Sequence, residues 1–175
     1  MIISLNTRIP FPRSLVYQTY RDKLLELLPY MPNVREIEIK YKREEDGRIC
    51  CVNEWRGGGE IPAVARAVIS EDMLTWTEHN VWDEAEFTLE WRIKTHAYTE
   101  AVQCSGKNRF LEEGDSTVIE NRGKLVIDQD KLEGIPPFLR GSVASVVEDF
   151  LGKKVGPNLV QMGEGVCAYL KQHSG

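Results

Sequence analysis

Five polar residues interrupt apolar rows in segments where apolar and polar side chains alternate: Asn53, Glu78, Asn80, Asn108 and Asn121. In a β-strand every second side chain points to the same face, so each would share a face with apolar neighbours. A buried amide or carboxyl group is costly unless its hydrogen bonds are met. An apolar pocket with a few convergent polar groups is typical of a small-molecule site. We therefore predict that these five side chains line a pocket and orient the carbonyl or hydroxyl groups of a ligand.

Three tryptophans occupy the same rows as the polar residues. Trp55, Trp76 and Trp82 are therefore predicted to form walls of the pocket, where an indole can stack on a flat ligand. Trp91 lies in the most regular alternation of the chain and is interpreted as part of the ordinary core. The glycines at residues 57–59 break the strand pattern and are predicted to form a flexible bend or a mobile lip at the pocket mouth.

The elements that position these residues follow from the period of the apolar pattern. A first strand is expected over about residues 2–8, and Pro12 then suits the start of a helix. About six further strands follow, and the acidic residues 44–46 with Gly47 form a hairpin turn between two of them. From Pro137 the spacing becomes helical to the end of the chain. We expect Gly152 and residues 156–158 to bend or interrupt this helix.

Side chains on the apolar side of the C-terminal helix are predicted to close the pocket: Val143, Val147, Phe150, Met162 and Val166. The element order predicts an α+β fold in which a curved antiparallel sheet of about six or seven strands wraps around this helix. No repeat, low-complexity tract or long linker is present, so residues 1–175 are expected to form a single domain.

The order of elements resembles the Bet v 1-like, or START-like (SRPBCC), superfamily, in particular its polyketide cyclase and lipid-transport-like branch. The resemblance spans almost the whole chain. It includes the segments NEWRGG, LTWTEHNVWD, FTLEWRI and ENRGKLVID, and the C-terminal helix. It implies a helix-grip fold whose central cavity, between sheet and helix, holds a lipid, sterol or polyketide. Members of the superfamily act as carriers, sensors, cyclases or chaperone partners, and no catalytic residue is carried over from them.

Composition argues against several other classes. The net charge is −5 with both signs interspersed, which disfavours a nucleic-acid partner. The chain has no apolar run long enough for a membrane span and no leader pattern, so a cytoplasmic protein with reduced cysteines is expected. Three scattered histidines and four cysteines match no metal-ligand spacing, so neither a metal nor a cofactor is expected. Glu78 and His79 are strand neighbours that face opposite ways and form a poor acid–base pair.

Three functions remain open. The leading hypothesis is a module that binds or transports a hydrophobic small molecule, because the cavity-type fold comes without a recognisable catalytic constellation. The alternative is a polyketide cyclase or aromatase, in which the cavity folds a substrate chain and polar groups polarise its carbonyls. A third possibility is a partner-binding interaction domain, which would have a filled interior and an exposed apolar patch.

Overall fold

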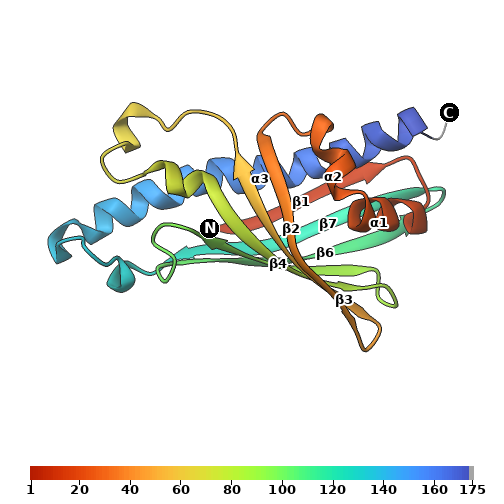
Figure 1. Cartoon of the computed structure of the whole chain (residues 1–175), viewed down its shortest axis with the longest axis horizontal. Coiled ribbons are helices and arrows are strands. Elements are labelled where there is room, and N and C mark those ends of the chain that lie inside the picture. The colour runs from red at the N-terminus through yellow and green to blue at the C-terminus, as the bar shows by residue number, and fades with distance from the viewer. Residues whose placement is uncertain (174–175) are drawn as a thin grey trace.

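The computed structural model describes residues 1–173, which form a seven-stranded antiparallel sheet, two short helices and one long helix (Figure 1). The strands are β1 (Ile2–Ile9), β2 (Val34–Glu45), β3 (Arg48–Gly57), β4 (Thr75–Asp83), β5 (Thr88–Thr95), β6 (Val102–Glu113) and β7 (Ser116–Ile127). The helices are α1 (Arg13–Asp22), α2 (Leu24–Leu27) and α3 (Arg140–His173). This architecture confirms the predicted α+β helix-grip fold.

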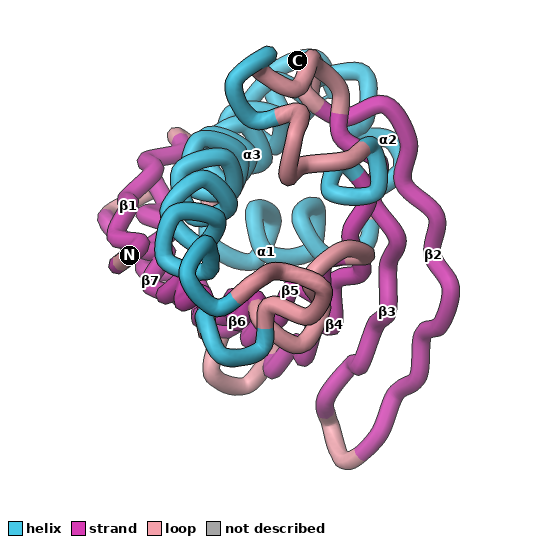
Figure 2. Tube along the Cα trace, turned by 90° about the vertical axis from the view of Figure 1, so that its left-hand side faces the viewer, coloured by secondary structure: helices cyan, strands magenta, loops and turns pink. Residues whose placement is uncertain are grey.

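The sheet has the order β1-β7-β6-β5-β4-β3-β2, so β2 through β7 form a meander and β1 joins its far edge. The predicted turn between β2 and β3 is present, and Asp46 and Gly47 adopt φ values of 51° and 77° there. Such left-handed residues match the twist of a tight hairpin. The sheet is curved, so its two edge strands, β1 and β2, lie on opposite sides of α3 (Figure 2), and α1 and α2 connect them.

The long helix α3 lies across the sheet and contacts β1 and β7 (Figures 1 and 2). A Cβ atom at Gly163 would lie 2.8 Å from the Thr7 side chain, so this glycine permits a close approach of helix and strand. The helix is continuous through Pro157, which corrects the expectation that residues 156–158 could interrupt it. Within residues 1–173, no helix is both long and apolar enough to cross a membrane.

One end of the space between the sheet and α3 is closed by an aromatic cluster. The fully buried Tyr17 of α1 makes edge-to-face contacts with Trp82, Phe87 and Phe110 at centroid distances of 5.0–5.3 Å. Its hydroxyl group donates a hydrogen bond to the Thr88 carbonyl oxygen at 3.1 Å. The cluster fixes α1 against the inner face of the sheet and thereby places Tyr20, one turn further on, beside Trp82.

Two glycines on neighbouring strands make room for a tryptophan on the inner face of the sheet. Gly106 of β6 and Gly123 of β7 are directly paired, and Trp91 of β5 is paired with Gly106. A Cβ atom at Gly106 would lie 2.4 Å from the indole ring of Trp91, and one at Gly123 would lie 2.9 Å from it. The two glycines therefore allow the Trp91 side chain to lie against the backbone of β6 and β7.

Candidate functional site

A cavity of about 120 Å³ lies between the inner face of the sheet and α3, with α1 at one end. Its volume is well above the roughly 10–15 Å³ that one water molecule requires. The side chains that line it are mainly apolar and aromatic, and they come from α1, from strands β2 to β6 and from the middle of α3. This is the composition expected of a pocket for an organic ligand.

Eight of the thirteen residues predicted for the pocket line this cavity: Asn53, Trp55, Trp76, Glu78, Asn80, Trp82, Asn108 and Met162. The other five, Asn121, Val143, Val147, Phe150 and Val166, are buried but lie outside its lining. Besides Met162, the side chains of α3 that line the cavity are Leu151, Lys154, Val155, Asn158 and Leu159. The apolar stripe of α3 was thus predicted correctly, but the hollow lies against its middle and not against its first turns.

Sequence reasoning missed two aromatic residues of the lining, Tyr20 and Trp91. Tyr20 belongs to an amphipathic helix whose apolar side gives no indication of a polar ligand. Trp91 was interpreted as core, and it is both buried and part of the lining. As a result all four tryptophans of the chain border the cavity.

Asn108 has an orientation set by its neighbour Trp91. The Trp91 Nε1–H donates a hydrogen bond to Asn108 Oδ1 at 2.9 Å in a fully buried environment. Because an indole nitrogen can only donate, the Asn108 oxygen must face it and the amide Nδ2 must point away. This Nδ2 has no hydrogen-bond partner within residues 1–173. Asn108 therefore presents an N–H donor at the cavity, close enough to the Tyr20 hydroxyl group to offset part of the rise in its pKa that burial causes.

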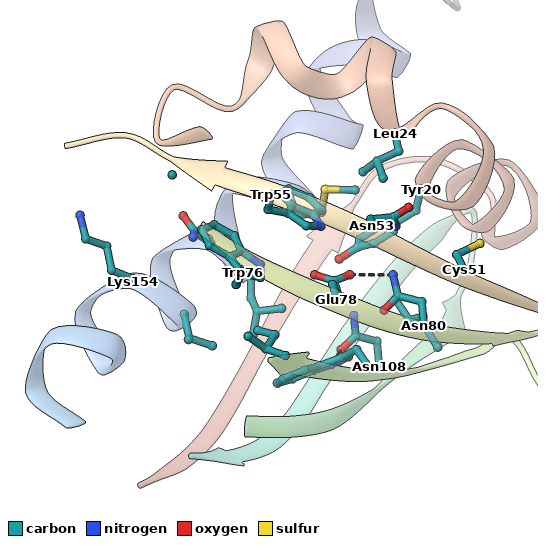
Figure 3. A pocket seen from close by; sticks show the side chains of 18 of the residues that line it. Tyr20, Leu24, Cys51, Asn53, Trp55, Trp76, Glu78, Asn80, Asn108 and Lys154 are labelled. Atoms are coloured by element: carbon teal, nitrogen blue, oxygen red, sulfur yellow. Dashed lines mark hydrogen bonds between the residues drawn. The ribbon is translucent and has the colours of Figure 1, made fainter. Parts of the chain in front are cut away.

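Glu78 and Asn80 lie two residues apart on β4 and form the polar end of the cavity (Figure 3). Asn80 Nδ2 donates a hydrogen bond to Glu78 Oε1 at 2.6 Å, which leaves Asn80 Oδ1 as a buried acceptor without a partner in the described part of the chain. Burial raises the pKa of Glu78 to about 7, and the hydrogen bond from Asn80 offsets part of this effect. Near neutral pH the carboxyl group is therefore poised between its two protonation states.

Trp55 and Trp76 form a flat aromatic wall beside this polar end (Figure 3). They are directly paired across β3 and β4, with ring centroids 5.9 Å apart and planes at 11°. The Nε1–H groups of both indoles are buried and lack an acceptor within residues 1–173. The wall therefore offers an apolar surface and two unused hydrogen-bond donors.

Tyr20 adds a phenol to the same end of the cavity (Figure 3). Burial raises the pKa of its hydroxyl group strongly, and the nearby Glu78 carboxylate adds to the effect. The phenol therefore stays protonated over the physiological range and remains a hydrogen-bond donor.

Lys154 of α3 lies at the opposite end of the cavity from Glu78 (Figure 3). Its Nζ atom is 3.4 Å from the Gly58 carbonyl oxygen and 5.7 Å from the centre of the Phe150 ring. Gly57 and Gly58, from the segment predicted to form a lip, also line the cavity. The loop that follows β3 and the middle of α3 thus meet at this end through Lys154.

Asn121, the residue directly paired with Asn108, is also buried but has a different surrounding. It is paired on its other side with Leu5 of β1, and its Nδ2 atom has no partner in the described residues. Because it lies outside the cavity lining, a ligand in the cavity gives no account of this unpaired amide.

No protein-family model and no curated protein matches the chain. Solved structures do match over almost the entire length. A point mutant of norcoclaurine synthase from Thalictrum flavum, in complex with a transition state analogue, is 16% identical with a TM-score of 0.65, covering 100% of this chain and 96% of that one. The protein TTHA0849 from Thermus thermophilus is 20% identical with a TM-score of 0.64, and 97% of this chain and 99% of that one are covered.

An aromatase/cyclase from Streptomyces sp. R1128 is 17% identical with a TM-score of 0.63, covering 100% of this chain and 96% of that one. At this level of identity, the agreement concerns the fold. Together with the sheet order and the long C-terminal helix, it shows that the chain shares the helix-grip fold of these structures.

Proposed function

We propose that this protein binds a hydrophobic small molecule with an aromatic or similarly flat body and a few hydrogen-bonding groups. One observation carries the proposal. Seven buried side-chain polar atoms of residues 1–173 have no hydrogen-bond partner, and five of them belong to residues that line the cavity. These five are Asn53 Oδ1, Trp55 Nε1, Trp76 Nε1, Asn80 Oδ1 and Asn108 Nδ2.

Unpaired buried groups are rare because each costs about 1–3 kcal/mol. Five of them around one cavity, and few elsewhere in the described residues, are accounted for by a bound partner that supplies the missing donors and acceptors. The five unpaired atoms include both N–H donors and amide oxygen acceptors, so the ligand carries oxygen acceptors as well as hydrogen-bond donors. The two indoles and the apolar lining match a flat body between these groups.

The fold comparisons are consistent with this proposal. One protein of the same fold is named an aromatase/cyclase, and another is a norcoclaurine synthase that holds a transition state analogue. The interaction-domain alternative expected a filled interior, which the cavity argues against.

A variant pair tests the proposal by comparing an unpaired amide inside the cavity with one outside it. Asn53→Leu removes a cavity group, whereas Asn121→Leu removes a buried amide from the neighbourhood of β1. Both changes relieve an unpaired polar atom, so both should leave the unliganded protein as stable as the wild type or more stable. Only Asn53→Leu should weaken ligand binding, by roughly fivefold or more.

The ligand is first identified by native mass spectrometry of protein purified from cells, followed by extraction under denaturing conditions. Its affinity is then measured by the fluorescence of the four cavity tryptophans. Equal affinities of the two variants would contradict the proposed site. A protein that retains no small molecule and shows no fluorescence change with lipid, sterol and polyketide panels would contradict the function.

Cyclase chemistry is a second candidate, favoured by a carboxyl group with a pKa of about 7 inside the cavity. The Glu78 carboxylate would take a proton from a carbon between two carbonyl groups of a polyketide chain. The resulting carbanion would form a carbon–carbon bond with another carbonyl carbon of the same chain, and the alkoxide formed there would take the proton back from the Glu78 carboxyl group. Turnover of such a chain that falls at least about a hundredfold in Glu78→Ala, with ligand affinity retained, would support this candidate.

A further inference from the structure

Glu78 is a carboxylate without a positive partner in the described structure. No lysine, arginine or histidine nitrogen of residues 1–173 lies within ion-pair distance of its oxygens. Its hydrogen-bond partner among these residues is the neutral amide of Asn80. A charged carboxylate inside a protein is stabilised when an opposite charge or a full set of donors compensates it. Within residues 1–173, Glu78 has neither.

Three cationic side chains line the cavity, Arg21, Lys42 and Lys154, and none of them is within ion-pair distance of Glu78. Arg21 is paired with Asp22 at 2.8 Å and lies 3.7 Å from Glu84. Lys154 lies at the far end of the cavity, beyond the two tryptophans (Figure 3). No cation of the lining therefore pairs with Glu78, and a positively charged group on a ligand would compensate its charge.

The hydrogen-bonding groups around Glu78 match the donors of an ammonium group. Asn53 is directly paired with Glu78 across β3 and β4, and Asn80 lies two residues along the same face of β4. The carboxylate, Asn53 Oδ1 and Asn80 Oδ1 give three acceptor groups, two of them unpaired amide oxygens. The orientation of Asn80 is determined by its N–H donation to Glu78. A protonated primary amine carries three N–H donors and no acceptor.

The aromatic wall adds a second feature that favours a cation. Trp76 precedes Glu78 by two residues on the same face of β4, and Trp55 lies parallel to it. A cation within about 6 Å of an indole ring is attracted to its face, and tryptophan is the strongest aromatic partner for this interaction. The same indoles would hold the apolar body of the ligand.

We propose that the cavity accepts an amine ligand, with its protonated nitrogen held by Glu78, Asn53 and Asn80 and its flat apolar body against Trp55 and Trp76. This assignment rests on the proposed small-molecule-binding function and specifies the chemical class of the ligand.

The assignment carries a defined pH dependence. The titratable groups that sense the charge of Glu78 are Tyr20 from α1, Cys51 from β3 and Cys104 from β6. Burial raises the pKa of all three, so they stay neutral near pH 7. An alkylamine stays protonated below about pH 9. Glu78 is then the group whose ionisation governs amine binding.

Calorimetry with two matched probes tests the assignment. Naphthylethylamine and naphthylethanol share the aromatic body and differ in the charged group. At about pH 8, where Glu78 is ionised, the amine should bind roughly tenfold or more tightly than the alcohol. At about pH 5 the preference should shrink severalfold because Glu78 is protonated. Binding of the amine at about pH 7 should also release a proton, which calorimetry in buffers of different ionisation enthalpy measures.

Glu78→Gln should abolish the preference for the amine while affinity for the alcohol is retained. Glu90→Gln is the matched control, because Glu90 is an exposed glutamate of β5 that lies 3.8 Å from Lys107. This control should bind both probes like the wild type.

Two results would overturn the assignment, and they can be told apart. If the alcohol binds and the amine binds no better at any pH, the amine assignment fails and the proposed binding function stands. If neither probe binds to the folded wild-type protein, the amine assignment fails, and the panels of lipids, sterols and polyketides then decide on the binding function. The pH series on the wild type decides the question even if a variant does not fold.

Discussion

Glu78→Gln should stabilise the unliganded protein at neutral and alkaline pH, and the size of the gain follows from the pKa of the carboxyl group. Burial raises this pKa from the ordinary value of 4.5 to about 7. A raised pKa means that the folded state prefers the protonated acid. Below about pH 4.5 the carboxyl group is protonated in both the folded and the unfolded state, so it does not reduce the stability of the protein. As the pH rises toward 7, the group ionises more readily in the unfolded state, and the free energy of unfolding falls.

The magnitude is obtained from the difference between the two pKa values. A shift of about 2.5 units, from 4.5 to about 7, corresponds to about 3 kcal/mol at 1.36 kcal/mol per unit. Nearly all of it is present at about pH 8, and less than about 1 kcal/mol at about pH 5. Glutamine keeps the shape of the side chain and can accept the Asn80 hydrogen bond, but it carries no charge at any pH.

Urea unfolding, followed by tryptophan fluorescence at several values between about pH 5 and about pH 8, measures this effect. The difference in free energy of unfolding between Glu78→Gln and the wild type should grow from under about 1 to about 3 kcal/mol over this range. Glu90→Gln, which changes an exposed glutamate, should show no such trend. A stability difference that stays constant with pH would refute the view that Glu78 is a partly buried carboxyl group whose charge is uncompensated.

Four further predictions concern the sheet, α3 and the surroundings of the cavity. Gly106→Ala should destabilise the protein by about 2 kcal/mol or more in urea unfolding, because the new Cβ would lie 2.4 Å from Trp91. Gly165→Ala in α3, where the nearest atoms are 3.5 Å away, should instead stabilise it by about 0.5–1 kcal/mol. A double-mutant cycle of Asn108→Leu and Trp91→Phe should give a coupling energy of about 1–2 kcal/mol for their hydrogen bond, and additive effects would contradict it. Cys104 should resist alkylation in the native protein at about pH 8, because burial raises its pKa to about 12. The two partly exposed cysteines, Cys50 and Cys167, should react, and mass spectrometry of the labelled chain distinguishes these outcomes.

Alternation along the strands was sufficient to assign the faces of the sheet. Asn53, Asn80, Asn108 and Asn121 were all predicted to point inward, and each has at most 5% of its surface exposed. The prediction succeeds because the side-chain period of a strand is two, so one correctly placed apolar residue determines the direction of its neighbours.

The same pattern could not separate Asn108 from Asn121. They are directly paired on neighbouring strands and have the same sequence signal, yet only Asn108 lines the cavity. The partners decide the difference: Asn108 lies beside Trp91 of β5, whereas Asn121 is paired with Leu5 of β1. These partners come from residues far away in the sequence, so no local pattern contains them.

The sequence by itself determined the order of the elements, the inward rows of the strands and the apolar stripe of α3, because these depend on local periodicity and turn residues. Tertiary structure alone decided where along α3 the hollow lies, which leaves Val143, Val147 and Phe150 outside it and places Leu151 and Val155 in it. It also decided that Glu78 has no cationic partner among the described residues. The place of the cavity and the surroundings of Glu78 depend on how α3 and α1 pack across the curved sheet. This packing is determined by contacts between segments that are distant in the sequence.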